Sequence, residues 1–260
     1  MSPSVAQLNL TALYTIARRE VRRILRIWGQ TLVPPAITMT LYFLIFGKLI
    51  GSRIGDMGGY DYMDYIVPGL VMMSVIQNAY GNISSSFFGA KFGRHVEELL
   101  VSPMPNWVIL AGYVAGGVLR GLMVGAIVLA IALCFTHVRV PHPFVMFTTV
   151  LLGATVFSLA GFVNAAYAKK FDDIAIIPTF VLTPLTYLGG VFYSVTLLPG
   201  WAQTATHANP IFYMVNAFRY GLLGVTDVSL WLAYGVMLGF AVALATLSLW
   251  LLKRGTGMRS

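Results

Sequence analysis

The residues that could perform chemistry are few in this chain and lie far apart. A helical metal site needs two ligands at i, i+4 spacing, which the four histidines lack: His95, His137, His142 and His207. The single cysteine, Cys134, excludes an internal disulfide and a multi-cysteine metal site. Neither a G-x-S-x-G turn nor a G-x-x-x-x-G-K-[ST] phosphate loop occurs. We therefore expect no catalytic residue, no metal and no cofactor bound by this chain.

Ionisable side chains gather instead in one short stretch, KFGRHVEELLVSPMPNW, at residues 91–107. The spacing predicts an amphipathic helix over 91–102, which Pro103 and Pro105 end. Its apolar stripe would be Phe92, Val96, Leu99 and Leu100, beside the charged Lys91, Arg94, Glu97 and Glu98. Such a helix has one face that can bind a partner. A plain polar connector between two apolar segments explains the same residues.

The elements that must position this stretch are long apolar segments. Of the 260 residues, 58% are hydrophobic and 10% are charged, against roughly 25% charged residues in soluble domains. The mean hydropathy is +0.78. Because a bilayer satisfies no backbone polar group, we expect an all-α membrane protein, organised as one domain over residues 1–260. The net charge of +8 lies in short clusters between apolar runs, so we expect no nucleic-acid partner.

Six spans are predicted, at about 31–51, 63–88, 107–135, 143–168, 174–193 and 228–252. Twelve of the seventeen Lys and Arg residues fall in the N-terminal segment, the second and fourth loops and the tail. Because positive residues are retained in the cytoplasm, both termini and the 91–102 stretch are predicted to be cytoplasmic. The first apolar run follows a long charged segment, so we expect a retained anchor rather than a cleaved signal peptide.

Two segments are predicted to be helical without spanning the bilayer. Residues 7–28 combine apolar residues at helical spacing with Arg18, Arg22 and Arg26, which favours a helix lying in the cytoplasmic interface. A plain positive anchor fits this segment equally well. Residues 195–220 are apolar but broken by Pro199, Gly200 and Pro210, so we expect short re-entrant helices on the outer side.

Polar residues inside the predicted spans allow two interpretations. The second span carries Gln77, Asn78, Asn82 and three serines, and the fifth carries Thr183 and Tyr187 among prolines. A translocation pathway and a tight helix interface both supply the partners that these groups need. Arg120 is either a functional intramembrane cation or a side chain that reaches back to the cytoplasmic surface. No carboxylate stands clearly at mid-span, which weakens proton-coupled transport.

Four motifs together resemble the ABC-2 type permeases, the membrane subunits of ATP-driven exporters. They are E-E-L-L-V-S-P at Glu97 to Pro103, G-G-V-F-Y at Gly189 to Tyr193, L-P-G-W at Leu198 to Trp201, and N-P-I-F-Y-x-x-x-x-x-R from Asn209 to Arg219. Each motif alone is weak, but their order and spacing resemble this family over essentially the whole chain.

The resemblance implies a bacterial inner-membrane permease that forms a homodimer with two separate ATP-binding subunits, which bind the ATP and Mg²⁺. It implies that residues 91–102 are the coupling helix that docks on that partner, through Phe92, Arg94, Val96, Glu97, Glu98, Leu99 and Leu100. It places Gln77, Asn78, Asn82, Thr183 and Tyr187 along the pathway, and Tyr193, Trp201, Asn209, Tyr213 and Arg219 in an outer gate. The substrate would be an amphipathic or hydrophobic drug, lipid or glycan, exported by alternating access, with membrane lipid around the complex.

Two other function classes remain open from the sequence. A channel or proton-coupled carrier would work without any ATP-binding partner. A non-transporting membrane scaffold would show no effect of substrate on ATPase activity.

Overall fold

The protein is seen in a computed structural model that describes residues 4–57, 59–136, 139–255 and 257. Within these residues the secondary structure is helical except for one small hairpin. Its strands, β1 (Asp56–Met57) and β2 (Tyr60–Asp61), have two residues each and pair antiparallel. The helices are α1 (Val5–Arg26), α2 (Trp28–Tyr42), α3 (Gly51–Ile54), α4 (Tyr62–Phe92), α5 (His95–Val101), α6 (Asn106–Leu133), α7 (Pro143–Tyr167), α8 (Asp173–Ile177), α9 (Thr183–Tyr187), α10 (Gly200–His207), α11 (Pro210–Leu223) and α12 (Leu230–Arg254). Two wider π-helical turns, η1 (Phe43–Ile50) and η2 (Pro178–Leu182), and a 3₁₀ turn, η3 (Val195–Leu197), complete it.

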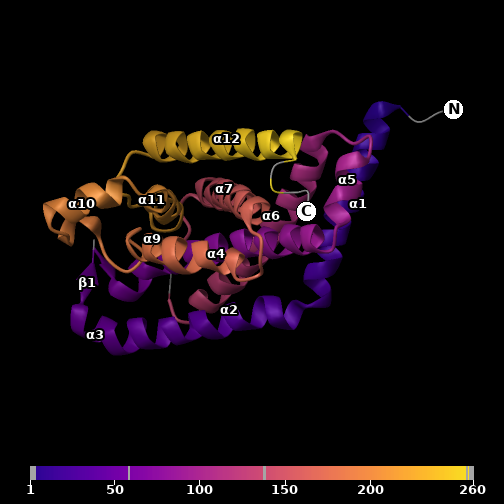
Figure 1. The fold of residues 1–260 in the computed structure, drawn as a ribbon. Helices are drawn as coiled ribbons and strands as arrows, with labels where there is room; N and C mark the ends of the chain where they lie inside the picture. Colours follow the sequence, from indigo (N-terminus) through magenta and orange to yellow (C-terminus); the bar gives the residue numbers. More distant parts are fainter. Residues whose placement is uncertain (1–3, 58, 137–138, 256, 258–260) are drawn as a thin grey trace.

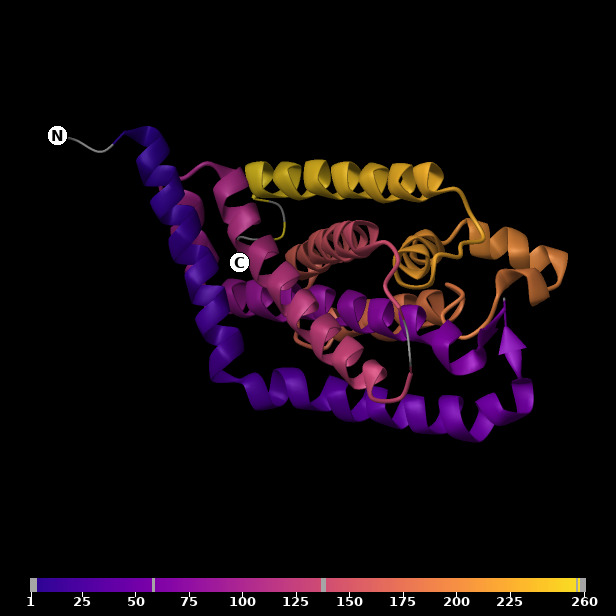
Figure 2. The same ribbon diagram turned by 180° about the vertical axis from the view of Figure 1, so that it is seen from behind.

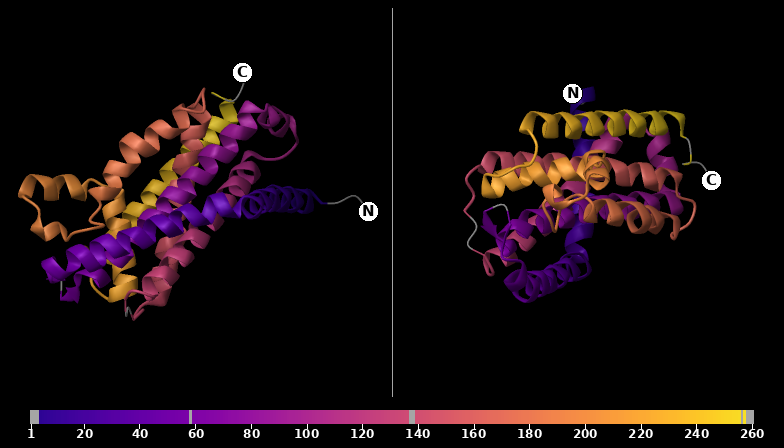
Figure 3. Two further views of the ribbon diagram at one scale, coloured as in Figure 1. Left: turned by 90° about the horizontal axis from the view of Figure 1, so that it is seen from below. Right: turned by 90° about the vertical axis from the view of Figure 1, so that its left-hand side faces the viewer.

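The long helices run side by side, and α1 crosses one end of the bundle (Figures 1 and 2). α5, α1 and the last turn of α12 gather at that end, which we call the α5 end. α3, the β1–β2 hairpin and α10 gather at the opposite end, the α10 end. Figure 3 shows α10 projecting beside the bundle at one end and α1 extending away from it at the other.

α4 is the centre of the fold. Most of its residues from Tyr62 to Phe88 are buried, on all sides of the helix. It packs on α6 and α7 along much of its length, and on α11 near the α10 end. Glycines in α6 permit the close approach, since a Cβ at Gly121 would lie 3.1 Å from the Ala79 Cβ. α4 is therefore the helix against which the others are positioned.

The six-span prediction is met only in part. Among the described residues, four helices are long and apolar enough to cross a membrane: Trp28–Gly47, Asn106–Leu133, Pro143–Tyr167 and Leu230–Arg254. They match the predicted first, third, fourth and sixth spans. The predicted second span is α4, which is longer than expected but does not reach the same apolarity. Its amides and serines lower its hydropathy, and neighbouring helices rather than lipid cover most of it.

The predicted fifth span, 174–193, ends earlier than expected. The apolar helix runs from Asp173 to Tyr187, which is about 22 Å at 1.5 Å per residue, short of a hydrocarbon core of about 30 Å. The chain turns at Gly190, whose φ is +73°. Gly189 is packed closely, since a Cβ there would lie 2.8 Å from Ile211 Cγ2. The glycine pair therefore ends the helix, whereas the prediction extended the span through it.

The predicted interfacial helix, 7–28, begins and ends slightly earlier as α1. Ser4 caps its first turn through a reciprocal pair of hydrogen bonds with Gln7. Ile27, with φ −109° and ψ 31°, breaks the helix, so Trp28 starts α2 instead of ending α1. α1 consequently turns away from the direction of α2 at one residue (Figure 2).

Candidate functional site

Residues 91–102 form the end of α4, a joint at Gly93 and Arg94, and the short helix α5, not one continuous helix. α4 continues to Phe92, and Arg94 then adopts a left-handed φ of +62° before α5 starts at His95. Gly93 precedes this residue and leaves room for His95, since a Cβ at Gly93 would lie 2.7 Å from His95 Nδ1. Lys91 and Phe92 therefore belong to α4. α5 ends at Val101, directly before Ser102 and Pro103, as the prolines predict.

Lys91 ties the end of α4 to the end of α7. Its ammonium donates to the Ala166 carbonyl at 2.8 Å and to the Ala168 carbonyl at 2.6 Å. A lysine that caps carbonyls at a helix C-terminus also interacts favourably with the helix dipole. Burial lowers the pKa of the Lys91 ammonium, and the nearby Asp173 carboxylate opposes that shift. Lys91 thus holds the base of α5 in place and is not part of an exposed docking face.

α5 buries one side and presents the other. Val96 is buried in the core at the α5 end, and Leu99 and Leu100 pack partly against it. Val101 is 86% exposed and Phe92 is 67% exposed. The remaining predicted coupling residues are polar; Arg94 and Glu98 are exposed, and Glu97 is half-buried. The face open to a partner is therefore a mixed one of charged and apolar side chains.

A hollow of about 340 Å³ separates α5 from α1. Leu8, Thr11 and Ile16 of α1 line one wall, and Leu99 and Met104 line the other. Its lining is mostly apolar and it is open to the outside. The hollow is therefore large enough for an inserted apolar side chain.

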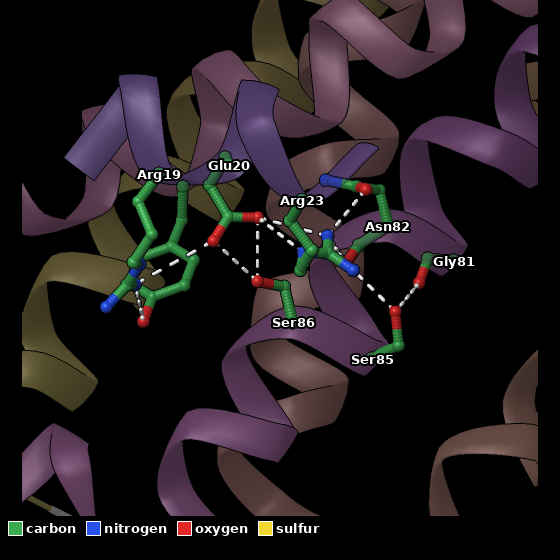
Figure 4. Close-up of polar contacts among 8 residues, drawn as sticks. Arg19, Glu20, Arg23, Gly81, Asn82, Ser85 and Ser86 are labelled. Carbon is green, nitrogen blue, oxygen red and sulfur yellow. Dashed lines mark hydrogen bonds and ion pairs between the residues drawn. The ribbon is translucent and has the colours of Figure 1, made fainter. Parts of the chain in front are cut away.

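A buried carboxylate on α1, Glu20, holds this helix to the bundle (Figure 4). Its side chain is 2% exposed. Ser86 of α4 donates its hydroxyl to the carboxylate, with 2.7 Å to each oxygen. The Arg23 guanidinium donates to Oε2 from both Nη2, at 3.0 Å, and Nε, at 3.3 Å. The buried charge is therefore both paired and hydrogen-bonded, which is the condition for burying it at tolerable cost.

Arg23 extends the same network to Asn82 in the middle of α4. Its Nη2 donates to Asn82 Oδ1 at 2.7 Å and lies 3.3 Å from the Asn82 carbonyl. Asn82 itself is fully buried. On the other side of Glu20, Arg19 donates to the Tyr113 hydroxyl of α6 at 2.6 Å. α1 is therefore bound by polar contacts to both α4 and α6 (Figure 4).

Two glycines of α6 make room for this docking. A Cβ at Gly112 would lie 2.6 Å from Ile16 Cγ2, and one at Gly116 would lie 2.6 Å from Glu20 Cβ. Arg120 follows one turn after Gly116, close enough to Arg23 for the two positive charges to interact. Its Nε is buried and has no hydrogen-bond partner among the described residues. Arg120 therefore lies near Arg23 of α1, about halfway along α6.

The predicted pathway residues lie in different surroundings. Asn82 is enclosed by the contact with α1, whereas Gln77 and Asn78 are half-buried. Thr183 is half-buried and donates to the Pro178 carbonyl, while Tyr187 is 40% exposed. The Tyr187 hydroxyl lies 3.0 Å from the Tyr42 hydroxyl of α2. A pathway along these residues stays a prediction.

The predicted outer-gate residues at the α10 end divide into anchored and exposed ones. Asn209 caps α11, accepting from the Ile211 amide at 3.0 Å and donating to the Leu185 carbonyl at 2.6 Å. Tyr213 donates to the His207 carbonyl at 2.8 Å. Tyr193 is half-buried, and Trp201 is 78% exposed. Their role as a gate stays a prediction.

Arg219 is a buried cation at the α10 end. Its Nη2 donates to the Gly190 carbonyl at 2.7 Å, and its Nη1 lies 3.5 Å from Asn216 Oδ1. Its Cζ stands 4.1 Å from the centre of the Tyr65 ring, which is a cation–π distance. The Asp227 carboxylate is 4.0 Å away. Arg219 therefore joins α4, α11 and the G-G-V-F-Y segment.

Sequence reasoning missed Glu20 and the partners of Arg219. Glu20 is the only acidic residue among the arginines of the N-terminal segment. It shares i, i+4 spacing with the buried Ile16 and Ile24, which marks it as lying on the packed face. For Arg219, the sequence places Asn216 three residues earlier on the same helix. Its contacts with Tyr65 and Gly190 form only in the folded chain.

The described residues contain no group of three or more His, Cys, Asp or Glu that could hold a metal ion. His137 and Arg259 lie outside those residues.

Comparison with known proteins adds three findings. The model of a protein family described as ABC-2 type transporter matches residues 11–223. The chain is 60% identical to the inner membrane transport permease YadH of Escherichia coli K12 over 249 residues, which cover 96% of this chain and 97% of that protein. It is 25% identical to nodulation protein J of Rhizobium leguminosarum bv. trifolii over 215 residues, covering 82% of each chain.

Proposed function

The chain belongs to the ABC-2 type transporter family, and we propose that it is the membrane subunit of an exporter driven by ATP that a separate subunit hydrolyses. It is a multi-pass transport permease of the inner membrane, like the relative that it matches over nearly its whole length. The absence of a phosphate loop from the sequence supports the division of labour between two subunits.

The observation that carries this proposal is the geometry of α5. It is a short helix at the tip of α4, beside α1, with Glu98 and Val101 exposed. Its base is held by Lys91 and its inner side by Val96. A rigid helix presented in this way transmits movement of a bound partner into α4, because α4 packs against α6, α7 and α11.

In the proposed mechanism, ATP brings two ATP-binding subunits together and α5 moves with them. α4 follows, and the two permease halves of a homodimer rearrange about a central pathway. The apolar side chains exposed on α2 and on Asp173–Tyr187 support a lipid or subunit interface there, among them Ile37, Leu41, Phe180 and Val181. The amides and hydroxyls of the predicted pathway residues, together with the Tyr187 ring, suit an amphipathic substrate.

Charge reversal on α5 tests the proposal. The permease would be co-reconstituted with its ATP-binding subunit in proteoliposomes, and ATPase activity and efflux would be measured. We expect Glu98→Lys, alone and with Glu97→Lys, to abolish stimulation of ATPase activity by the permease while leaving the permease inserted. Asp56→Lys, an exposed charge reversal in β1, is the matched control at the opposite end. Unchanged ATPase activity and efflux in the α5 variants would refute the assignment.

Flux through the purified chain without any ATP-binding subunit tests the rival class. An ATP-independent channel or proton-coupled carrier would move substrate down an imposed gradient in that preparation. We expect no such flux. Substrate-stimulated ATPase activity of the complete complex then distinguishes a transporter from a membrane scaffold, and a screen over drugs, lipids and glycans identifies the substrate class.

A further inference from the structure

The arginines of α1 form two rows with different surroundings. Arg19 and Arg23 face the bundle, where Tyr113, Glu20 and Asn82 accept their hydrogen bonds. The second row, Arg18, Arg22 and Arg26, is exposed, and no ion pair or side-chain hydrogen bond holds any of its members within the described part of the chain. The Arg18 Cζ lies 5.9 Å from the centre of the Tyr14 ring, which is a long cation–π distance.

The side chains of both rows surround an open hollow of about 590 Å³. Tyr14 and Thr15 line it together with Arg18, Arg19, Arg22, Arg23 and Arg26. The carboxylate of Glu20 is buried on the opposite side of the helix and neutralises part of the inner row only. The positive charge around the hollow is therefore only partly neutralised, and an anion can bind there.

The fold places this hollow at the surface of the membrane. Arg26 ends α1, and the spanning helix starts two residues later at Trp28. α1 crosses the direction of that helix (Figure 2). Trp28 is 60% exposed, and aromatic side chains at the end of a span stand at the level of the lipid headgroups. Leu25 and Tyr14, also exposed, provide apolar contact beside the arginines.

The spacing of the outer row suits phosphate groups. Arg18, Arg22 and Arg26 follow one another at four-residue intervals, about 6 Å along the helix axis. Guanidinium groups bind phosphate through paired N–H donors and stay charged at any physiological pH. We propose that Arg18, Arg22 and Arg26 form a binding site for the phosphates of anionic phospholipids in the leaflet that α1 contacts. The site does not depend on ATP or on the transported substrate.

Native mass spectrometry of the full-length chain in a neutral detergent tests this site. The protein is titrated with phosphatidylglycerol, and with phosphatidylcholine as the neutral lipid. We expect retention of phosphatidylglycerol only. The triple variant Arg18→Gln, Arg22→Gln and Arg26→Gln should bind it about 100-fold more weakly, since each arginine near an anionic lipid surface contributes about fivefold.

A second triple variant, Lys169→Gln, Lys170→Gln and Lys253→Gln, removes the same charge from exposed positions elsewhere. It should bind phosphatidylglycerol within about threefold of the unmodified protein. An equal loss in both triple variants would reduce the effect to net charge and overturn the site, as would unchanged binding by the arginine variant.

Two further arms decide the source of the phosphate. Inorganic pyrophosphate is added as a soluble competitor, and it should not displace the lipid at equal concentration. Displacement would assign the arginines to a soluble polyphosphate. The ATP-binding subunit is added in the last arm, and loss of the bound lipid from the unmodified protein would assign the row to that protein instead.

Discussion

Two charged residues are buried in the described part of the chain, one at each end of the molecule and of opposite sign. At the α5 end the buried group is the Glu20 carboxylate, 2% exposed, and its partner Arg23 is 30% exposed. At the α10 end the buried group is the Arg219 guanidinium, 2% exposed, and its partner Asp227 is 29% exposed. At each end, therefore, one charged side chain is buried in the bundle, and its partner of opposite charge lies near the surface.

Each buried charge lies beside side chains of opposite charge. Arginines of α1 crowd the α5 end, so the buried Glu20 carboxylate lies among cations. The α10 end carries Asp56, Asp61 and Asp227 as well as the exposed Arg53 and Arg139, and the buried Arg219 lies beside the Asp227 carboxylate. The buried charge joins helices that lie far apart in sequence, while its half-exposed partner stays hydrated. Removing the contacts of the charge that water reaches less easily should reduce the free energy of unfolding more.

Removing Arg219 should have the largest effect. Arg219→Ala leaves the Gly190 carbonyl without its side-chain donor and the Asp227 carboxylate without its cation, and it opens a void beside Tyr65. We expect a loss of about 3–5 kcal/mol in the free energy of unfolding in detergent. Arg139→Ala, an exposed arginine at the same end, should change it by less than about 0.5 kcal/mol. A similar small loss for Arg219→Ala would show that its contacts contribute little.

Removing Glu20 should cost less, about 2–3 kcal/mol, because Arg23 and Arg19 can turn to water. A double-mutant cycle of Glu20→Ala with Arg23→Ala isolates the ion pair, and we expect a coupling free energy above about 1 kcal/mol. Glu98→Ala, which removes an exposed carboxylate nearby, is the control. Additive losses in the cycle would mean that the two residues act independently.

Substituting Gly116, where α6 contacts α1, tests the docking of α1 without replacing a charged residue. Gly116→Ala places a Cβ 2.6 Å from Glu20 Cβ, so we expect a loss of about 1–2 kcal/mol from overpacking. Gly239 in α12 has nothing within 4 Å of a Cβ, so Gly239→Ala should stabilise the protein by about 0.5–1 kcal/mol through helix propensity. Gly116→Ala should therefore lower the thermal unfolding temperature, and Gly239→Ala should raise it. Stabilisation by both substitutions would contradict the close approach of α1.

The smallest effect concerns a carboxylate that is only half-buried, that of Asp173. Asp173 accepts hydrogen bonds from the backbone amides of Lys169, at 2.7 Å, and Lys170, at 2.9 Å. These bonds lower the pKa of its carboxyl. The stabilisation is therefore fully present above the unfolded pKa of about 3.9 and is lost as the pH falls through the lower folded pKa.

We expect Asp173→Asn to reduce the hydrogen-exchange protection of the two lysine amides at neutral pH, with little change in global stability. Asp172→Asn is the adjacent control. Protection that is unchanged in Asp173→Asn would show that these two bonds do not order the loop.

The sequence predicts the elements that depend on local chemistry. α6, α7 and α12 start and end within a few residues of the predicted spans, because their apolarity is continuous. α10 starts at Gly200 after Pro199, and α11 starts at Pro210, as the helix-breaking residues indicate. Within the candidate site, the end of α5 before Pro103 is predictable for the same reason.

What the sequence leaves open depends on contacts across long separations. The break at Arg94 needs a left-handed conformation that is uncommon for residues other than glycine, and nothing in 91–102 demands it. The burial of Glu20 requires Gly116 on another helix. The early end of the predicted fifth span follows from the packing of Gly189 against Ile211. The pairing of α5 with a partner protein stays a prediction in both the sequence and the fold.

The attachment of α1 also sets an order of events during synthesis. Glu20 receives its hydrogen bond from a serine 66 residues later in the chain, and Arg19 reaches a tyrosine 94 residues later. Until α4 and α6 have left the ribosome and entered the membrane, neither partner exists. During that interval α1 keeps its full set of charges at the aqueous surface. We expect its docking to be a late step of assembly, detectable as delayed protease protection of α1 (Val5–Arg26) in a translation time course.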